Sequence, residues 1–567
     1  MFLFMQNRLV SYSHSVVIAV KAFCLLLLSS QCFAQNYHNY IWPIDSPFSV
    51  TGNYGELRPN HFHAGIDFST HGVINLPIYA VEEGYVSRIR VSTTGYGKSI
   101  YITHPDGKVS LYAHLNVFSL KIASIAKKQQ YNIQNYEFDL LLKPKTVFVI
   151  KNEIIALSGN TGSSTGPHLH FEIRDELSET PLNPFLFYKL TDNSPPELWH
   201  LGFYDLSDTC DPRWMNGVKV TRNHNDSLVL ADDHLVLEYS IVGLSFAGFD
   251  RLFPLGNPNN IYSAELYLDD QLIYSHTLDH IDFADGRYCN EFSEAIGKHK
   301  YQKCFLPEMT PPEMYHNCIN KGRLILNDSV YKKLRLKVQD EFGNSSSLQC
   351  YVKARKINGY RGSAIKSDLF VKSHENFDLA KDNVQIHIPA NTLYYSTPII
   401  IENTIASSGK LIILPREANL RSPYTLGLAV PERYRAHAEQ LVLRSGKSVF
   451  TPVLRNDSLF YSLKNFDWYH LELDTLPPQI KTEYSSRKLK EVWKMDSFSF
   501  HITDHLSGVG RYNVWLNNIW VLAEYDTKTD LLTYYFDEET PIGLLQYRVE
   551  VIDRVGNKKY FDYLLKK

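Results

Sequence analysis

Two matching phrases, both after the first 190 residues of this 567-residue chain, constrain how it folds. The phrase DNSPPEL begins at Asp192, and the related phrase DTLPPQI begins at Asp474. Each is followed by a second shared phrase, DEFGN from Asp340 and DRVGN from Asp553. A repeated pair of phrases indicates a repeated structural unit, so we expect two related modules. The first copy is longer than the second by about 69 residues.

Both copies contain short stretches in which apolar and polar residues alternate. They include residues 229–239 and 261–268 of the first copy and residues 512–522 and 545–552 of the second. Alternation with a period of two, broken by Asp, Gly and Asn, is typical of strands joined by turns. The 37 Tyr and 30 Phe of the chain also favour strands. Short strands at regular spacing indicate β-sandwiches of the immunoglobulin-like kind.

These patterns predict a mainly β protein with four folded units. Residues 35–190 are rich in Gly and His and end in a Pro-bearing linker. Three β-sandwich modules follow, at residues 191–356 with a cysteine-bearing insertion, 357–473 and 474–567. The 58 basic and 61 acidic residues give a net charge of -3. Because this balance provides no positive field for phosphates, we expect no nucleic-acid partner.

The first 34 residues have the pattern of a secretory signal. They contain Arg8 and Lys21 but no Asp or Glu, and an apolar run at residues 22–28 is followed by small and polar residues up to Ala34. A membrane anchor is the alternative, but Lys21 interrupts an apolar stretch that is too short to cross a bilayer. We therefore expect export, to the periplasm or the cell envelope.

Five cysteines that follow the signal segment lie in one 141-residue window, at Cys210, Cys289, Cys304, Cys318 and Cys350. In an exported protein such clustering predicts up to two disulfides and one free thiol. The alternative is that these are ordinary buried cysteines. No Cys-x-x-Cys spacing occurs, so we do not expect a zinc site made of cysteines.

Two segments of the first unit carry residues suited to metal chemistry. In HFHAGIDF, even spacing along a strand lets His63 and Asp67 face the same way. In GPHLHFEI, His168 and His170 alternate with apolar residues and share one face of a strand. Two histidines and one aspartate with a fourth position open form a catalytic zinc set. Spacing alone does not decide which histidine of the second segment binds the metal.

A predicted hairpin brings a further histidine. Residues 99–104 and 108–114 alternate on either side of a Pro-Asp-Gly turn. The second strand ends in YAHL and carries His114 at its end. His104 lies beside the turn, where we expect it on the surface.

The ordered motifs HxGxD from His63, YAHL from Tyr112 and GNTGxSxGPHLHFE from Gly159 resemble the LytM/lysostaphin-type zinc metallopeptidases of family M23. The resemblance covers residues 48–187, about a quarter of the chain. It implies an antiparallel β domain with a groove across its sheet. It also implies an endopeptidase that acts on peptide bridges of bacterial peptidoglycan.

Carried over by position, the resemblance assigns roles to individual residues. It implies that His63, Asp67 and His170 hold Zn²⁺. It implies that His114 and His168 are catalytic histidines that do not bind the metal. Such rings take up and return protons and help to stabilise a developing oxyanion.

Four further positions are less constrained. Tyr54 matches a substrate-binding tyrosine of the family, with groove packing as the alternative. Glu172 shares the histidine face and either supports it or lies at the rim, and we favour the rim. Residues 116–148, with helical spacing at 120–134, exceed the usual length, so we expect them over or beside the groove, with a surface helix as the alternative. Asn152 replaces a usual glycine and tolerates similar turn geometry.

We therefore expect an exported, zinc-dependent endopeptidase that hydrolyses peptide cross-links or stem peptides of bacterial peptidoglycan. One alternative is a catalytically inactive LytM-like protein that binds the wall or activates another hydrolase, which the complete ligand set disfavours. A second is a peptidase of other glycine-rich proteins. We expect the β modules to bind or position, with an envelope protein as a candidate partner. The oligomeric state is undetermined by the sequence.

Overall fold

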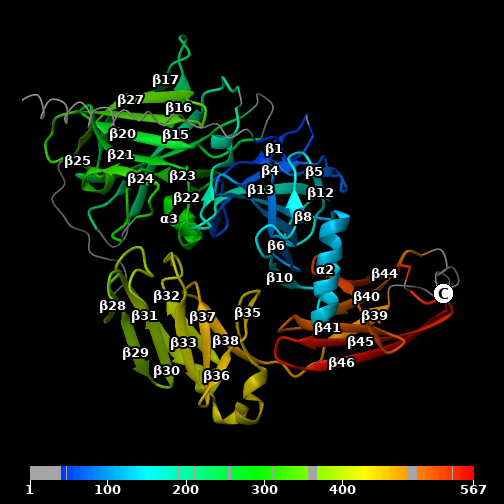
Figure 1. Ribbon diagram of the computed structural model, residues 1–567. Coiled ribbons are helices and arrows are strands. Elements are labelled where there is room, and N and C mark those ends of the chain that lie inside the picture. The colour runs from blue at the N-terminus through cyan, green and yellow to red at the C-terminus, as the bar shows by residue number, and fades with distance from the viewer. Residues whose placement is uncertain are drawn as a thin grey trace, which may run out of the picture.

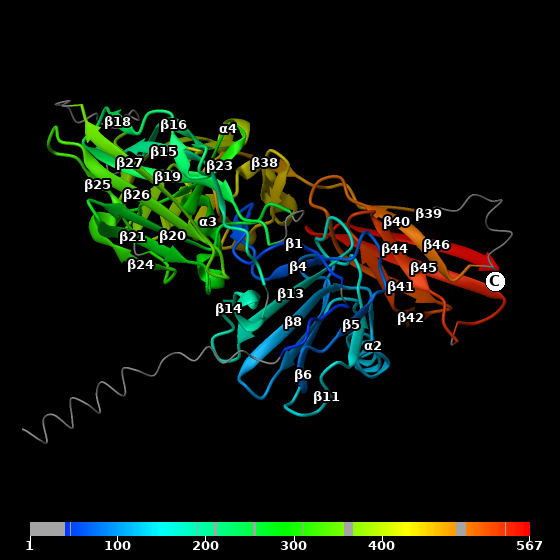
Figure 2. The same ribbon diagram turned by 90° about the horizontal axis from the view of Figure 1, so that it is seen from above.

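The computed structural model describes residues 40–566, except for residues 46, 190, 209–211, 253–256, 310, 356–366, 483–494 and 539. The predicted signal segment and Cys210 lie outside the described residues. The described chain is mainly β, which confirms the expected fold class. Figures 1 and 2 show an N-terminal domain (residues 40–189) and three modules (residues 191–355, 367–474 and 475–566) in contact with one another. No helix in the described ranges combines the length and apolar character needed to span a membrane.

The N-terminal domain is built on a large antiparallel sheet. Its strands, in spatial order, are β1 (Val50–Gly52), β4 (Ile66–Ser69), β13 (His168–Asp175), β8 (Lys108–Leu115), β7 (Lys98–Thr103), β6 (Gly84–Val91) and β10 (Phe138–Leu141), with β11 (Phe148–Val149) on β6 and β14 (Pro181–Leu182) on β13. Two small sheets pair β5 (Pro77–Tyr79), β12 (Ile154–Leu157) and β9 (Val117–Phe118), and β2 (Leu57–Arg58) and β3 (His61–Phe62). A short 3-10 helix, Pro184–Phe187, closes the domain.

The first module consists of two sheets that enclose one apolar core. One sheet holds β17 (Leu228–Leu230), β16 (Arg213–Arg222), β15 (Glu197–Asp205), β19 (Ile241–Phe249), β23 (His299–Lys303), β22 (Ser293–Ile296) and β25 (Leu324–Ile325). The other holds β18 (His234–Leu237), β27 (Ser345–Ala354), β26 (Lys332–Gln339), β20 (Ser263–Leu268), β21 (Gln271–Thr277) and β24 (Tyr315–Cys318). The short helix α3 (Cys289–Phe292) belongs to the insertion.

The second and third modules are also two-sheet sandwiches. One sheet of the second module holds β28 (Leu369–Val371), β31 (Thr397–Thr404), β32 (Lys410–Leu414), β38 (Trp468–Leu473), β34 (Leu441–Ser445) and β35 (Ser448–Phe450). Its other sheet holds β29 (Phe377–Lys381), β30 (Val384–Ile388), β33 (Tyr424–Ala429), β37 (Ser458–Leu463) and β36 (Val453–Arg455). The module also contains the short helix α4 (Ile405–Ser408). One sheet of the third module holds β39 (Gln479–Thr482), β40 (Ser497–Thr503), β44 (Leu531–Tyr535) and β43 (Ala523–Asp526). The other holds β42 (Ile519–Val521), β41 (Val509–Leu516), β45 (Leu544–Asp553) and β46 (Lys558–Lys566).

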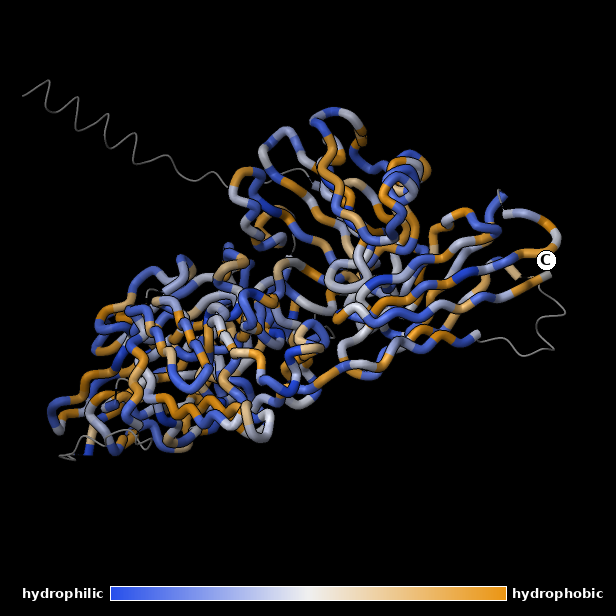
Figure 3. Tube along the Cα trace, turned by 90° about the horizontal axis from the view of Figure 1, so that it is seen from below, coloured by the Kyte–Doolittle hydropathy of each residue, from blue (hydrophilic) through white to orange (hydrophobic). Residues whose placement is uncertain are grey.

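Side-chain alternation explains these sandwiches. Hydrophobic and hydrophilic residues alternate along the strands in Figure 3. Strand β27 shows the pattern: its residues are alternately buried and exposed or half-buried along Ser345–Ala354. Because successive side chains point to opposite faces of a sheet, one face of each strand enters the core and the other remains outside it.

The two repeated phrases meet in space in the first and third modules. The Asn344 amide donates a hydrogen bond of 3.0 Å to the carbonyl of Asp192. At the equivalent place the Asn557 amide donates one of 2.9 Å to the carbonyl of Asp474. Each module therefore uses the end of its last turn phrase to hold the linker through which the chain enters it.

The inserted segment of the N-terminal domain contacts the third module. Its helix α2 (Leu120–Ile133) matches the predicted helical spacing and lies beside that module in Figure 1. The Tyr131 ring meets Trp520 edge to face, with centroids 5.3 Å apart, and Lys127 pairs with Asp537 at 3.0 Å. The strand after the helix, β10, forms the sheet edge farthest from β1. The segment therefore contacts the third module through α2, and its position over or beside the groove stays a prediction.

The predicted disulfides are absent among the described cysteines. Cys289, Cys304, Cys318 and Cys350 are all free thiols, and three of them are buried. Cys304 and Cys350 pack in the core of the first module, whereas Cys289 belongs to a separate cluster. Among the described cysteines the prediction of up to two disulfides was wrong, and the alternative of ordinary buried cysteines holds for Cys289, Cys304 and Cys350.

The N-terminal domain and the first two modules share an apolar cluster. Tyr54 and Phe62 of the domain pack with Phe292 of the first module and Tyr394 of the second. The rings of Phe62 and Phe292 lie 5.6 Å apart in an edge arrangement. These residues are 5% exposed or less. The N-terminal domain therefore depends on the modules for part of its core.

We expect Phe292→Ala to lower the free energy of unfolding by about 3–5 kcal/mol, because it removes a ring from this shared cluster. Phe148→Ala is the matched control, since Phe148 is 54% exposed, and it should change stability by about 0.5 kcal/mol or less. Chemical denaturation of the full chain measures both. Equal effects of the two substitutions would contradict a shared core.

Candidate active site

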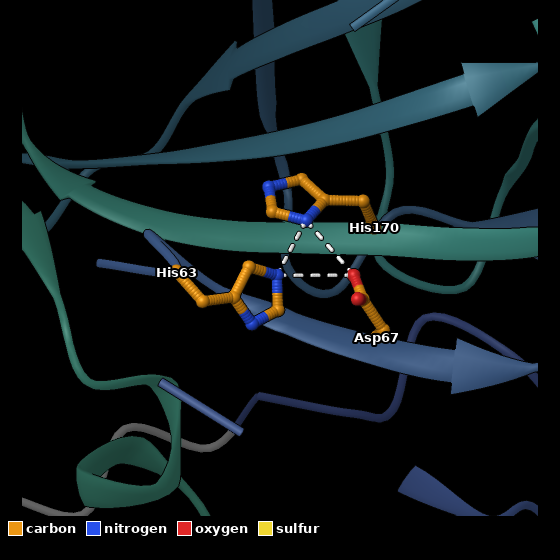
Figure 4. A group of neighbouring side chains, drawn as sticks. All are labelled: His63, Asp67 and His170. Carbon is orange, nitrogen blue, oxygen red and sulfur yellow. Dashed lines mark hydrogen bonds and ion pairs between the residues drawn. The ribbon is translucent and has the colours of Figure 1, made fainter. Parts of the chain in front are cut away.

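Three predicted metal ligands converge on one point of the large sheet (Figure 4). Asp67 on β4 lies directly opposite His170 on β13, so their side chains share a face, and His63 follows β3. The Nε2 atom of His63 is 2.9 Å from Nδ1 of His170 and 3.1 Å from Oδ1 of Asp67. The last two atoms are 2.9 Å apart. All three residues are buried.

Hydrogen bonds on the far sides of both rings assign their tautomers. The Nδ1–H of His63 donates to the carbonyl of Asn53 at 2.7 Å. The Nε2–H of His170 donates to the carboxylate of Glu172 at 2.7 Å. Both acceptors lack a proton, so neutral rings present lone pairs to the centre, together with Asp67 Oδ1. Three atoms that can each donate an electron pair to one centre fit a cation, and two imidazoles with one carboxylate fit Zn²⁺.

The second oxygen of Asp67 is also occupied. The Arg58 guanidinium donates to Asp67 Oδ2 and to Glu56, with Nη2 3.0 Å from Oε2 of Glu56. This pairing leaves Oδ1 of Asp67 for the centre. Burial opposes ionisation of Asp67, but His63 and His170 hold the pKa of this carboxyl well below its usual range.

Glu172 is a supporting residue and not a rim charge. Its side chain is fully buried, and its carboxylate also accepts a 2.7 Å bond from Nε of Arg174 and one from the Tyr96 hydroxyl. Burial opposes its ionisation, but Arg174 and His170 lower the pKa of Glu172 to about 2. The rim assignment was wrong because β13 has neighbouring strands on both sides and its face is covered at this point. Strand alternation was the signal that placed Glu172 beside His170.

The centre attracts positive charge. Burial lowers the pKa of His170, but hydrogen bonds to Asp67 and Glu172 outweigh burial and raise it to about 9. The pKa of the deeply buried His63 is lowered, chiefly by burial. The carboxylates around His170 therefore favour positive charge at the centre.

The two other predicted histidines lie beside this centre. The rings of His114 and His168 have centroids 4.7 Å apart, and Nε2 of His168 is 3.5 Å from Oδ1 of Asp67. Backbone carbonyls accept from their Nδ1 atoms, that of Thr161 for His114 and that of Gly166 for His168, each at 2.8 Å. In the neutral form each ring therefore carries its lone pair on Nε2.

Local backbone geometry holds His114 in place. It is the second-last residue of β8 and has a φ of 58°, in the left-handed region, and its backbone N–H donates to the carbonyl of Tyr96. Gly162, with a φ of 74°, packs so closely that a Cβ would lie 2.3 Å from the carbonyl oxygen of Gly95. Only glycine fits there, and this contact fixes the loop that supplies Thr161. Burial, followed by the charges of His170 and His168, lowers the pKa of His114 to about 3, so the ring is neutral at physiological pH.

Known proteins resemble this part of the chain. Residues 61–132 match the model of peptidase family M23. The DD-carboxypeptidase/endopeptidase Mpg of Neisseria meningitidis is 31% identical over 141 residues, which are 25% of this chain and 26% of that protein. The peptidoglycan DD-endopeptidase ShyA of Vibrio cholerae is 30% identical over 138 residues, 23% of this chain and 26% of that one. The chain contains an M23 peptidase domain.

The chain matches about a quarter of the length of these relatives. Lysostaphin from Staphylococcus simulans is 28% identical over 130 residues, 22% of this chain and 21% of that protein. A solved structure of the catalytic domain of the M23 protein EnpA from Enterococcus faecalis is 25% identical and covers 26% of this chain and 95% of that one, with a TM-score of 0.19 over the whole chain.

Two further residues of the M23 domain are buried. Tyr54 is 1% exposed and donates a 2.8 Å bond to the carbonyl of Pro181, inside the cluster shared with the modules. Its burial in this cluster matches the packing alternative, and substrate binding by Tyr54 stays a prediction. His104 is also buried, not exposed, since its ring bonds to Ser110 at 2.7 Å and to the carbonyl of Glu83 at 2.8 Å.

Tyr96 is the tyrosine at the centre. Its ring centroid lies 5.4 Å from that of His170, and its hydroxyl donates to Glu172. The phrase Gly95-Tyr96-Gly97 marked this position in the sequence, but nothing in the phrase linked it to the metal ligands.

We expect Glu172→Gln to weaken Zn²⁺ binding by about 10- to 100-fold, because an amide is a poorer acceptor for the His170 N–H than a carboxylate. Competition with a chromophoric chelator measures the affinity. Glu176→Gln, on the exposed end of the same segment, is the control and should bind zinc like the parent protein. Thermal unfolding of both variants separates loss of metal affinity from loss of the fold. Unchanged affinity in a folded Glu172→Gln protein would contradict the supporting role.

Proposed function

We propose that this protein is a zinc-dependent endopeptidase that hydrolyses peptide cross-links or stem peptides of bacterial peptidoglycan. The observation that carries the proposal is the meeting of three metal-binding atoms beside two imidazoles whose Nε2 atoms are free to act as bases. The relatives ShyA, named as a peptidoglycan DD-endopeptidase, and Mpg, named as a DD-carboxypeptidase/endopeptidase, support the substrate class. Export to the periplasm or cell envelope is part of the proposal and rests on the pattern of residues 1–34.

In this proposal Zn²⁺ is held by Nε2 of His63, Oδ1 of Asp67 and Nδ1 of His170. When bound, it supplies Lewis acidity that polarises the scissile carbonyl and lowers the pKa of a bound water. The residues around it preserve the ligand geometry: Arg58 occupies the second oxygen of Asp67, and Glu172 keeps the His170 proton on Nε2.

The proton transfers are assigned to His114 and His168. A neutral imidazole whose Nδ1–H is engaged by a carbonyl can accept a proton only on Nε2. His168 has this nitrogen 3.5 Å from a ligand oxygen, within reach of a water at the centre. The rings of His168 and His114 are in contact, so a proton taken from the attacking water is available for the leaving amine. His114, whose pKa is lowered to about 3, is neutral before the reaction and suits a cycle in which a proton is taken up and then returned.

Single substitutions separate the two kinds of histidine. We expect His170→Ala to lose zinc and activity together, because a ligand is removed. We expect His168→Ala and His114→Ala to keep zinc nearly stoichiometric while activity falls by about 10²- to 10⁴-fold. Elemental analysis of the purified proteins gives the zinc content, and release of wall fragments gives the activity. If His168→Ala lost the metal and His170→Ala kept it, the assignment of these two residues would be reversed.

Digestion of purified peptidoglycan tests the substrate class. We expect mass spectrometry to detect new peptide termini in fragments released by the zinc-loaded protein, and none with His168→Ala. A glycine-rich protein offered beside the wall material should remain intact. Cleavage of that protein alone would support a peptidase of other proteins, and zinc binding without any cleavage would support an inactive wall-binding protein.

A further inference from the structure

Three carboxylates meet where the chain enters the first module. Asp192 comes from the linker, Asp250 directly follows β19 and Asp340 directly follows β26. One oxygen of each lies within 4.8 Å of the others. Asp250 and Asp340 are 3% and 1% exposed. The cluster is therefore a buried group of like charges.

The hydrogen bonds of these carboxylates are incomplete. Both oxygens of Asp340 are used, since they accept from the backbone and side chain of Asn344. Oδ1 of Asp192 accepts from the backbone of Ser194. Within the described part of the chain, the buried atoms Oδ2 of Asp192 and Oδ1 of Asp250 have no hydrogen-bond partner. A buried charge without a partner is costly, so these two oxygens indicate a missing positive ligand.

A neutral oxygen beside the cluster points to the same ligand. Asn259 lies opposite Asp250 in an antiparallel bridge, with backbone bonds of 2.8 and 3.0 Å in both directions. Directly opposite residues project from the same face, so the Asn259 amide lies beside the Asp250 carboxylate. Asn259 is 6% exposed, and its side-chain oxygen is buried with no hydrogen-bond partner among the described residues. Amide and carboxylate oxygens together are ligands for a hard cation.

The charges in this cluster repel one another. Burial, and then the charges of Asp340 and Asp192, raise the pKa of Asp250 to about 7. The pKa of Asp340 is also raised, first by burial and in part by Asp192. A bound dication would relieve this repulsion.

The third module repeats the arrangement. Asp474 from its linker, Asp504 after β40 and Asp553 at the end of β45 form a second cluster within 4.8 Å. Asp474 accepts a 2.9 Å bond from the backbone of Ser507. Oδ1 of Asp504 and the hydroxyl of Ser507, a residue 2% exposed, are buried with no partner in the described ranges. Two modules thus bring the same acidic positions together and leave oxygen atoms unsatisfied in both.

We propose that each of these clusters binds one Ca²⁺ ion that joins a module to the linker through which the chain enters it. The ligands on offer are all oxygens from carboxylates, an amide and a hydroxyl, which suits calcium and differs from the histidine-containing zinc set. The first ion would also affect the M23 domain, because Glu341, next to Asp340, accepts a 3.3 Å bond from Asn183 of that domain. Calcium would therefore stiffen the connection between the M23 domain and the first module.

Calorimetric titration of the full, zinc-loaded protein with CaCl₂ tests this proposal. We expect two ions to bind per chain, each with a dissociation constant of roughly 10⁻⁴–10⁻³ M, as is typical of extracellular calcium-binding modules. Asp250→Asn and Asp504→Asn should each bind one ion, and the double variant none. Asp233→Asn is the matched control, because Asp233 belongs to an exposed cluster with Asp232 and His234, and it should still bind two. No calcium uptake by the parent protein, or two ions bound by the double variant, would overturn the proposal.

Thermal unfolding gives a second test, because the effect of Asp250→Asn on the unfolding temperature should differ between calcium-free and calcium-containing buffer. Without calcium, Asp250→Asn should unfold at the same temperature as the parent protein or higher, because one repelling charge is gone. With about 5 mM CaCl₂, the parent protein should gain about 2–4 °C and the variant less. A variant that unfolds at lower temperature in calcium-free buffer would indicate a structural role alone and contradict the cation site. Equal stabilisation by MgCl₂ would overturn the choice of calcium.

Discussion

The pairing of β4 with β13 is the constraint on which the candidate site depends. Its register sets Asp67 directly opposite His170, and the next pair on the same face, Ser69 with His168, adds the second histidine of β13. Side chains alternate with a period of two, so a shift of one residue would turn both histidines into the core. The buried Leu169 and Phe171, which alternate with the two histidines, prevent that shift, because they would have to leave the core. Core packing therefore determines where the metal ligands point.

A second layer of charged groups makes the ligand geometry stable. Buried polar groups are favourable only when each finds a partner, and here His63, His170 and Asp67 each do. Glu172 connects the metal face to Arg174 and Tyr96, so a single carboxylate orients one ligand and neutralises a buried guanidinium. The proposed chemistry needs this layer because it keeps the lone pairs directed at one point.

The modules are part of the folded M23 unit and not simple appendages. The first and second complete an apolar cluster around Tyr54 and Phe62, and the third contacts α2. A further ion pair at 3.0 Å joins Lys98, on the strand next to β8, to Glu524 of the third module. Contacts on separate faces restrict how the M23 domain is presented to a large substrate. The repeated acidic clusters lie at the linkers, where stiffness has the largest effect on that presentation.

The sequence alone predicted the mainly β class, because strand alternation is a local property. Its motifs, through their resemblance to the M23 family, also predicted the set of His63, Asp67 and His170 and the two adjacent histidines, which the fold brings together. The sequence did not determine the position of Tyr54, the buried state of Glu172 or the free thiols, because these depend on which distant surfaces pack together. Tyr54 is buried by residues more than 200 positions away. The acidic clusters also depend on both sequence and fold. The phrases that contain Asp192 and Asp340 are visible in the sequence, but only the fold brings Asp250 next to these two residues. Packing between residues far apart in the sequence determines which polar side chains are buried, and burial determines which partners and which role each of them has.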